Sequence, residues 1–195
     1  LENVDTVVVL TGGAVLEDGN MTYTFLSSSE MFPRTSDCSV PSLPAPRYDD
    51  PSFLTAEPSP RVATCGTNFG GSCFVFNPEK QSWDENGMAR LPVSRFDHAV
   101  VSFPRIGVYM IGGIGGGNGE NDNGRTTDFL ARDSQEWVSG PAIPVVRMRH
   151  PCAVAITDNS FLAMFNKRVL EYQIDINNPT SIEGWQETSK WAGLQ

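Results

Sequence analysis

A set of markers recurs about every fifty residues along this chain, and this period constrains the fold more than any other feature. Apolar runs end in paired glycines at Gly13 and Gly113, two periods apart, with the related stretch "VATCGT" between them. The arginines and the tryptophans keep the same period, at Arg47, Arg95 and Arg147, and at Trp83, Trp137 and Trp185. Three kinds of marker with one spacing predict a repeat protein.

Each unit has the pattern of four short strands. The third unit shows it best: an apolar strand after the arginine (98–103), a strand before Gly-Gly (108–111), a strand with an aromatic residue (126–130), and a strand that carries tryptophan. Turns rich in Gly, Pro, Asn and Asp separate them. Because one such small sheet cannot bury both of its faces, several must pack around an axis. The pattern predicts an all-β fold.

The order arginine, apolar strand, Gly-Gly, aromatic, tryptophan resembles the Kelch repeat, whose units are the four-stranded antiparallel blades of a β-propeller. The resemblance covers nearly the whole chain and implies about four blades, at approximately residues 1–45, 46–93, 94–145 and 146–195. "CSVPSLP", "TCG" and "SC" are also similar to cysteine-containing Kelch proteins of secreted invertebrate type. The chain departs from the pattern where Cys65-Gly66-Thr67 replaces Gly-Gly and where "AMFNKR" has no glycine.

The number of units predicts an incomplete ring. The first unit lacks a strand before "TVVVL", so fewer than four full blades are present, whereas Kelch propellers commonly close with about six. We expect the chain to be part of a larger propeller; the alternative is a closed ring of four blades. The chain begins Leu1-Glu2 without an initiator Met or a signal peptide, which favours a mature product or a piece of a longer chain.

Charge and hydropathy exclude two classes of partner. The net charge of -9 opposes binding to nucleic acid or to an anionic membrane surface, and the basic residues form no cluster. The apolar runs are far shorter than the roughly 20 residues that cross a bilayer. We therefore expect neither a nucleic-acid nor a membrane partner.

The glycine-rich run "YMIGGIGGG" has two interpretations, a phosphate site or the end of a strand. A phosphate site needs a helix after the glycines, but a polar loop with Glu120 and Asp122 follows, and neither G-x-G-x-x-G nor a Walker lysine is present. We therefore interpret Gly112 and Gly113 as a strand end. Oxygen ligands in residues 118–123 suit calcium, but their spacing matches no EF-hand, and a solvated loop is favoured.

The sequence predicts no catalytic site, metal or cofactor. His98 and His150 occupy the same position beside an arginine, which indicates an architectural role, and no C-x-x-C pair is present to begin a zinc site. The three periodic tryptophans are expected to pack between neighbouring blades. Trp191 lies outside the period and has no assigned role.

Cys65 and Cys73 lie on consecutive strands of the second unit, and we predict a disulfide between them if they are directly opposed. Pairing of Cys38 with either of them, or with Cys152, and four free thiols are the alternatives. Asn20 begins the only sequon without proline in its middle position and is a candidate for glycosylation.

Because strands alternate in direction, the turns before the first strands and after the second strands share one face. The resemblance implies a protein ligand there, and the candidate binding residues are Asp49, Asn68, Asp97, Asn118, Glu120, Asp122 and Arg149. The leading hypothesis is a noncatalytic protein-interaction module, extracellular rather than cytoplasmic. The alternatives are an intracellular substrate adaptor for a ubiquitin ligase and a propeller enzyme, either a carbohydrate oxidase or a hydrolase.

Overall fold

The computed structural model describes residues 8–11, 14–16, 23–25, 29–32, 41–47, 50–56, 60–66, 70–115, 124–145, 150–166 and 168–188. Regular structure within these residues is β-strand apart from one 3-10 turn, η1 (Ile182–Gly184). None of the described segments forms a helix long and apolar enough to span a membrane. The predicted all-β class is confirmed.

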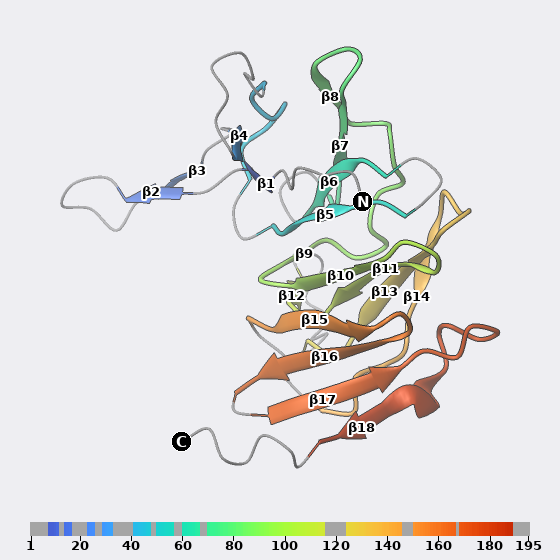
Figure 1. Cartoon of the computed structure of the whole chain (residues 1–195). Helices are drawn as coiled ribbons and strands as arrows, with labels where there is room; N and C mark the ends of the chain where they lie inside the picture. The colour runs from blue at the N-terminus through green and yellow to red at the C-terminus, as the bar shows by residue number, and fades with distance from the viewer. Residues whose placement is uncertain are drawn as a thin grey trace.

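Three four-stranded antiparallel sheets follow one another along the chain, and we call them blades 2, 3 and 4 (Figure 1). Blade 2 contains β5 (Ser52–Leu54), β6 (Val62–Cys65), β7 (Cys73–Asn77) and β8 (Ser82–Asp84). Blade 3 contains β10 (Ala99–Phe103), β11 (Gly107–Ile111), β13 (Thr127–Ala131) and β14 (Trp137–Ser139). Blade 4 contains β15 (Cys152–Thr157), β16 (Ser160–Phe165), β17 (Arg168–Gln173) and β18 (Trp185–Glu187). In each blade the strands pair in chain order, as the repeat predicts.

The first unit is different, because its described strands form two separate ribbons. β1 (Val8–Thr11) pairs with β4 (Ser29–Phe32), and β2 (Ala14–Leu16) pairs with β3 (Tyr23–Phe25). The sequence predicts that this unit lacks a strand before "TVVVL", and the residues described before position 40 form four short strands. A further ribbon joins β9 (Arg95–Phe96) to β12 (Ile114–Gly115) beside blade 3.

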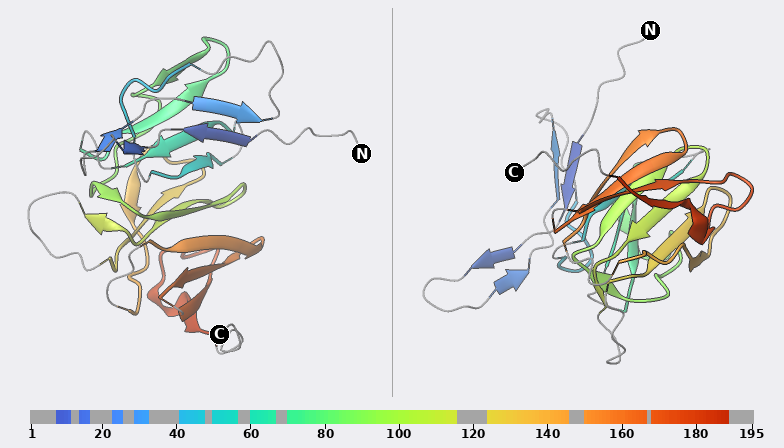
Figure 2. Two further views of the ribbon diagram at one scale, coloured as in Figure 1. Left: turned by 90° about the vertical axis from the view of Figure 1, so that its left-hand side faces the viewer. Right: turned by 90° about the horizontal axis from the view of Figure 1, so that it is seen from below.

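The blades pack face to face in a row in chain order, with blade 4 at one end (Figures 1 and 2). The first strands β5, β10 and β15 lie side by side along one edge of the row. We call the side of a blade that points to the preceding blade its near face, and the other side its far face. The far face of blade 2 and the near face of blade 3 form one apolar cluster, which contains Ala63, Cys65, Val75, Val108, Met110 and Leu130.

The same arrangement recurs one step further along the row. The far face of blade 3 packs on the near face of blade 4 in a cluster that contains Val101, Phe103, Tyr109, Phe129, Phe161, Phe165 and Tyr172. Tyr109 lies at its centre, with ring centroids 4.6 Å from Phe129 and 5.4 Å from Phe161. Burial raises the pKa of Tyr109, and its hydroxyl donates to the carbonyl of Pro179.

The periodic tryptophans join each blade to the segment that precedes it, and all three indole N–H groups donate to a backbone carbonyl there. The pairs are Trp83 to Pro41 at 2.9 Å, Trp137 to Ala89 at 3.1 Å, and Trp185 to Pro141 at 3.5 Å. Trp137 and Trp185 also pack in the clusters between blades, so the predicted role is confirmed for these two. Trp191 lies outside the described residues.

Candidate functional site

One end of the blades is built around two buried arginines, and we call it the Arg face; the first strands begin there and the second strands end there. Arg95 is fully buried. Its Nη1 donates to the carbonyls of Gly112 (2.9 Å) and Thr126 (3.2 Å), and its Nη2 lies 2.6 Å from Asp128 Oδ2. The guanidinium therefore fixes both ends of the loop between β11 and β13.

Arg47 has the same role in blade 2. Its Nη1 lies 3.1 Å from Asp50 Oδ2, and its Nη2 donates to the carbonyl and the hydroxyl of Ser72. Burial lowers the pKa of Arg47, and the Asp50 charge opposes this effect. A Cβ added at Gly66 would occupy the space of the Asp50 carboxylate. The second unit has only one glycine, Gly66, at the place of Gly-Gly. This glycine is the one that leaves room for the Asp50 carboxylate of the ion pair.

Gly112 and Gly113 end β11, as the sequence analysis predicts. Their φ angles are +65° and +89°, in the left-handed region that favours glycine. A Cβ on Gly113 would lie 2.6 Å from the Phe96 carbonyl oxygen. These glycines let the backbone turn tightly out of the sheet.

The predicted disulfide between Cys65 and Cys73 is present. The two residues are directly opposed on β6 and β7, with their Cα atoms 4.1 Å apart. Both are completely buried against Met88 and blade 3. Cys152 is a free and exposed cysteine, and Cys38 lies outside the described residues.

The two histidines have different environments, which corrects the expectation that they share one repeat position. His98 is buried, its ring nitrogens have no hydrogen-bond partner within the described residues, and burial together with the Arg95 charge lowers its pKa to about 3. His150 is exposed, and its Nδ1 lies 3.1 Å from Asp97 Oδ1.

Strand register explains the difference. Ala99 pairs with Ile111 and Cys152 pairs with Met164, at equivalent places in blades 3 and 4. This places His150, rather than Arg149, at the position of Asp97, and both residues have left-handed φ angles, +47° and +53°. The sequence analysis aligns Asp97 with Arg149, but the strand register aligns Asp97 with His150, one residue further along the chain.

Asp97 is the one predicted binding residue that the structure describes, and it lies at the junction of blades 3 and 4 on the Arg face. The other candidates lie outside the described residues: Asp49, Asn68, Asn118, Glu120, Asp122 and Arg149, together with the sequon residue Asn20. Their roles stay predictions. The described residues hold no group of three His, Cys, Asp or Glu that could bind a metal.

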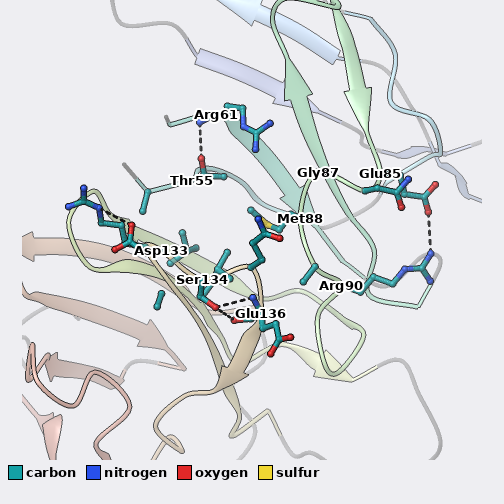
Figure 3. A pocket seen from close by; sticks show the side chains of 17 residues that line it. Thr55, Arg61, Glu85, Gly87, Met88, Arg90, Asp133, Ser134 and Glu136 are labelled. Carbon is teal, nitrogen blue, oxygen red and sulfur yellow. Dashed lines mark hydrogen bonds and ion pairs between the residues drawn. The ribbon is translucent and has the colours of Figure 1, made fainter. Parts of the chain in front are cut away.

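A groove of about 830 Å³ opens between blades 2 and 3 at the opposite end of the blades (Figure 3). Three segments form it: Thr55, Ala56 and Arg61 from the turn between β5 and β6, the segment after β8 (85–90), and the turn between β13 and β14 (131–136). Asp97, the one predicted binding residue that the structure describes, does not line it. Sequence reasoning missed this groove because no single segment carries a signal for it.

The groove combines an apolar floor with a charged rim. The half-buried Met88 supplies the accessible part of the floor, and the buried residues Val108 and Leu130 adjoin it. The rim carries Arg61 and two exposed ion pairs, Glu85 with Arg90 at 3.4 Å and Arg132 with Asp133 at 3.7 Å. Exposed ion pairs of this kind contribute little to the free energy of folding. Either charge can therefore pair with a bound molecule instead, at little cost in stability.

The fold was compared with known proteins. No family model and no curated protein sequence matches the chain. The chain is similar to the solved structure of YjhT, a Kelch-repeat β-propeller protein, with a TM-score of 0.59 and 14% sequence identity. The chain has the Kelch-type β-propeller fold. The match covers 97% of this chain and 64% of YjhT, so the chain corresponds to about two thirds of that propeller.

Proposed function

We propose that this propeller is a noncatalytic module that binds another protein, and that the groove between blades 2 and 3 receives an extended segment of the partner. The single observation that carries the proposal is the groove itself. Its apolar floor and charged rim have the anatomy of a protein interface, where a dry centre is surrounded by polar groups.

The position of the groove supports this role. It is built from turns that two packed blades hold in place, and loops on a rigid scaffold are where binding residues concentrate. Arg61 adds a cationic group to the rim beside Thr55, whose hydroxyl accepts from the Arg61 backbone N–H at 2.8 Å. The partner segment is expected to place apolar side chains on Met88 and an acidic side chain near Arg61.

The disulfide supports an extracellular setting for this module. Disulfides form and persist mainly in secreted proteins and are rare in the cytosol. The bond between Cys65 and Cys73 lies in the wall between blades 2 and 3, beside Met88. We therefore expect the groove to be exposed in an oxidising compartment.

A selection of phage-displayed random peptides on the intact chain tests the binding site. Ala56→Trp fills the groove, because Ala56 lines it and is partly exposed, and Arg61→Glu reverses the rim charge. Each is expected to weaken the selected peptides at least about tenfold, or about 1.4 kcal/mol. Val138→Trp is the matched control, because Val138 is exposed on β14 and does not line the groove.

Two outcomes contradict the proposal. Peptides that bind all three variants equally well would exclude the groove. Peptides whose binding is lost in Asp97→Asn, and kept in Ala56→Trp, would move the site to the Arg face. Asparagine tolerates the left-handed backbone of Asp97, so this variant tests the side chain and not the fold.

A further inference from the structure

The junction of blades 3 and 4 shows what fills the space that the groove leaves open between blades 2 and 3. Equivalent hydrogen bonds align the far faces of blades 2 and 3. The N–H of Gly66 donates to the carbonyl of Ser72, and the N–H of Gly112 donates to that of Thr126. The periodic tryptophans align the near faces of blades 3 and 4, because they pair with Leu130 in one blade and Tyr172 in the other.

Four aligned positions differ in the same way between the two junctions. At the junction that has the groove they hold aliphatic side chains, which are Ala63, Val75, Val108 and Leu130. At the next junction they all hold aromatic side chains, which are Tyr109, Phe129, Phe161 and Tyr172. The junction of blades 2 and 3 therefore lacks four rings that fill the junction of blades 3 and 4.

The chain also covers the aromatic junction with a segment of its own. The turn between β17 and β18 (174–184) is longer than its equivalent between β13 and β14 (131–136), which lines the groove. The hydroxyls of Tyr109 and Tyr172 donate to the carbonyl of Pro179 in this longer turn, at 2.8 and 3.1 Å. Aromatic rings and a backbone segment that binds them thus occupy the place that is open between blades 2 and 3.

The side chains of the groove suit an aromatic ring as well. Met88 lies in the groove (Figure 3), and its flexible thioether makes favourable contacts with aromatic rings. Three arginines line the groove, at Arg61, Arg90 and Arg132, and a guanidinium over the face of a ring adds a cation–π attraction. An aliphatic side chain gains neither of these interactions.

We propose that the partner inserts an aromatic side chain into the groove, where it packs on Met88. This inference rests on the proposed function, because it names the side chain that anchors the partner segment. The ring supplies volume that the aliphatic residues of this junction lack. The partner backbone on either side of the ring covers the groove, as the turn with Pro179 covers the next junction. Aromatic anchors in such desolvated sites often dominate the binding energy of an interface.

The affinity of the selected peptides for the intact chain tests the anchor. Peptides whose binding is weakened in Ala56→Trp are synthesised again with each aromatic residue replaced by alanine or by cyclohexylalanine. At one position alanine is expected to weaken binding at least about 30-fold. Cyclohexylalanine, which keeps the volume and loses the π electrons, is expected to weaken it about fivefold.

Failure of this inference differs from failure of the proposed function. Peptides that bind in the groove and contain no aromatic residue would overturn the inference and leave the proposed function standing. The same holds for groove-binding peptides that keep their affinity when every aromatic residue is alanine. Peptides that Ala56→Trp and Arg61→Glu bind as well as the parent chain does contradict the proposed function itself.

A second measurement locates the ring directly. The methionines are labelled with ¹³C in their methyl groups, and the Met88 signal is the one that Met88→Leu, a substitution of similar volume, removes. An aromatic ring in contact with this methyl group shifts its signal through the ring current, whereas a cyclohexyl group has no ring current. The aromatic peptide is therefore expected to shift the signal much more than its cyclohexylalanine form. Equal shifts would overturn the inference.

Discussion

At the scale of single residues, Gly113 and His98 share a crowded position at the Arg face. A Cβ on Gly113 would lie 2.8 Å from the Cβ of His98 and would also meet the Phe96 carbonyl. The backbone there has φ +89°, so a side chain is disfavoured both by conformation and by space. The turn therefore requires a residue without a side chain at position 113, in addition to the hydrogen bonds that hold Gly112.

Gly113→Ala is therefore expected to lower the free energy of unfolding by about 3 kcal/mol, measured by urea denaturation. Gly70→Ala is the matched control, because Gly70 has φ +68° but its added Cβ would meet nothing closer than 3.9 Å. The stability that Gly70→Ala loses measures the cost of the left-handed backbone alone, about 1 kcal/mol. Equal losses in the two variants would show that crowding at Gly113 does not matter.

His98 makes the stability of the fold depend on pH. Its pKa is about 3 in the folded protein and near 6.5 when unfolded, so the unfolded chain binds more protons between these values. Stability is therefore expected to fall as the pH decreases from 6.5, by up to about 1.4 kcal/mol per pH unit. Urea denaturation between pH 7 and pH 5 measures this slope.

A variant without the imidazole tests this assignment. His98→Phe is expected to flatten the slope above pH 5, where few carboxylates titrate. A slope that persists in His98→Phe would assign the pH dependence to another group.

At the scale of elements, the hairpin of β6 and β7 combines two constraints on one loop. The disulfide closes the loop at its base, and the Arg47 guanidinium binds Ser72 within it. In blade 3 the equivalent loop has no disulfide, and Arg95 binds Gly112 and Thr126 at its two ends. In blade 3 an arginine holds the loop without a disulfide. The disulfide of blade 2 is therefore an additional constraint on its loop.

Replacement of both Cys65 and Cys73 by alanine is expected to lower the free energy of unfolding by about 2.5 kcal/mol or more. The estimate comes from the entropy of a closed loop with a sequence separation of 8 residues, and the loss of two buried sulfur atoms adds to it. Cys152→Ser is the control, because Cys152 is exposed and unpaired. A variant as stable as the parent chain would show that the bond has no structural role.

At the scale of the whole molecule, the blades do not have equal numbers of neighbours. Blade 3 has a covered face on each side, whereas among the described residues no element covers the far face of blade 4, where Val154 is 47% exposed. Repeat proteins derive their stability from the interfaces between neighbours, so local opening is easiest at an uncovered end. Blade 3 is therefore the most stable part of the described row.

Native-state hydrogen exchange measures this difference directly. Backbone amides of β11 are expected to exchange more slowly than those of β16, its equivalent in blade 4. Faster exchange in β11 than in β16 in the 195-residue chain would contradict this view of the molecule.

The sequence by itself determined the blades, because the features that build a blade are local and repeat. The alternation of apolar residues sets the faces of each strand, the Gly-Gly pair marks a backbone conformation that few other residues adopt, and Cys65 and Cys73 flank a single hairpin. Each of these can be interpreted without knowing which blade lies next to it. The predicted strands of the third unit accordingly match the observed strands to within one residue at each end.

The tertiary structure alone decided what the ends of the blades present. A shift of one residue in register placed His150 opposite Asp97 and left His98 buried, although each histidine follows an arginine by three residues in the sequence. The groove needs Thr55, Met88 and Ala131 close together, and these come from three separate segments of two blades. Contacts of this kind depend on the rotation of one sheet against the next, which no local pattern encodes.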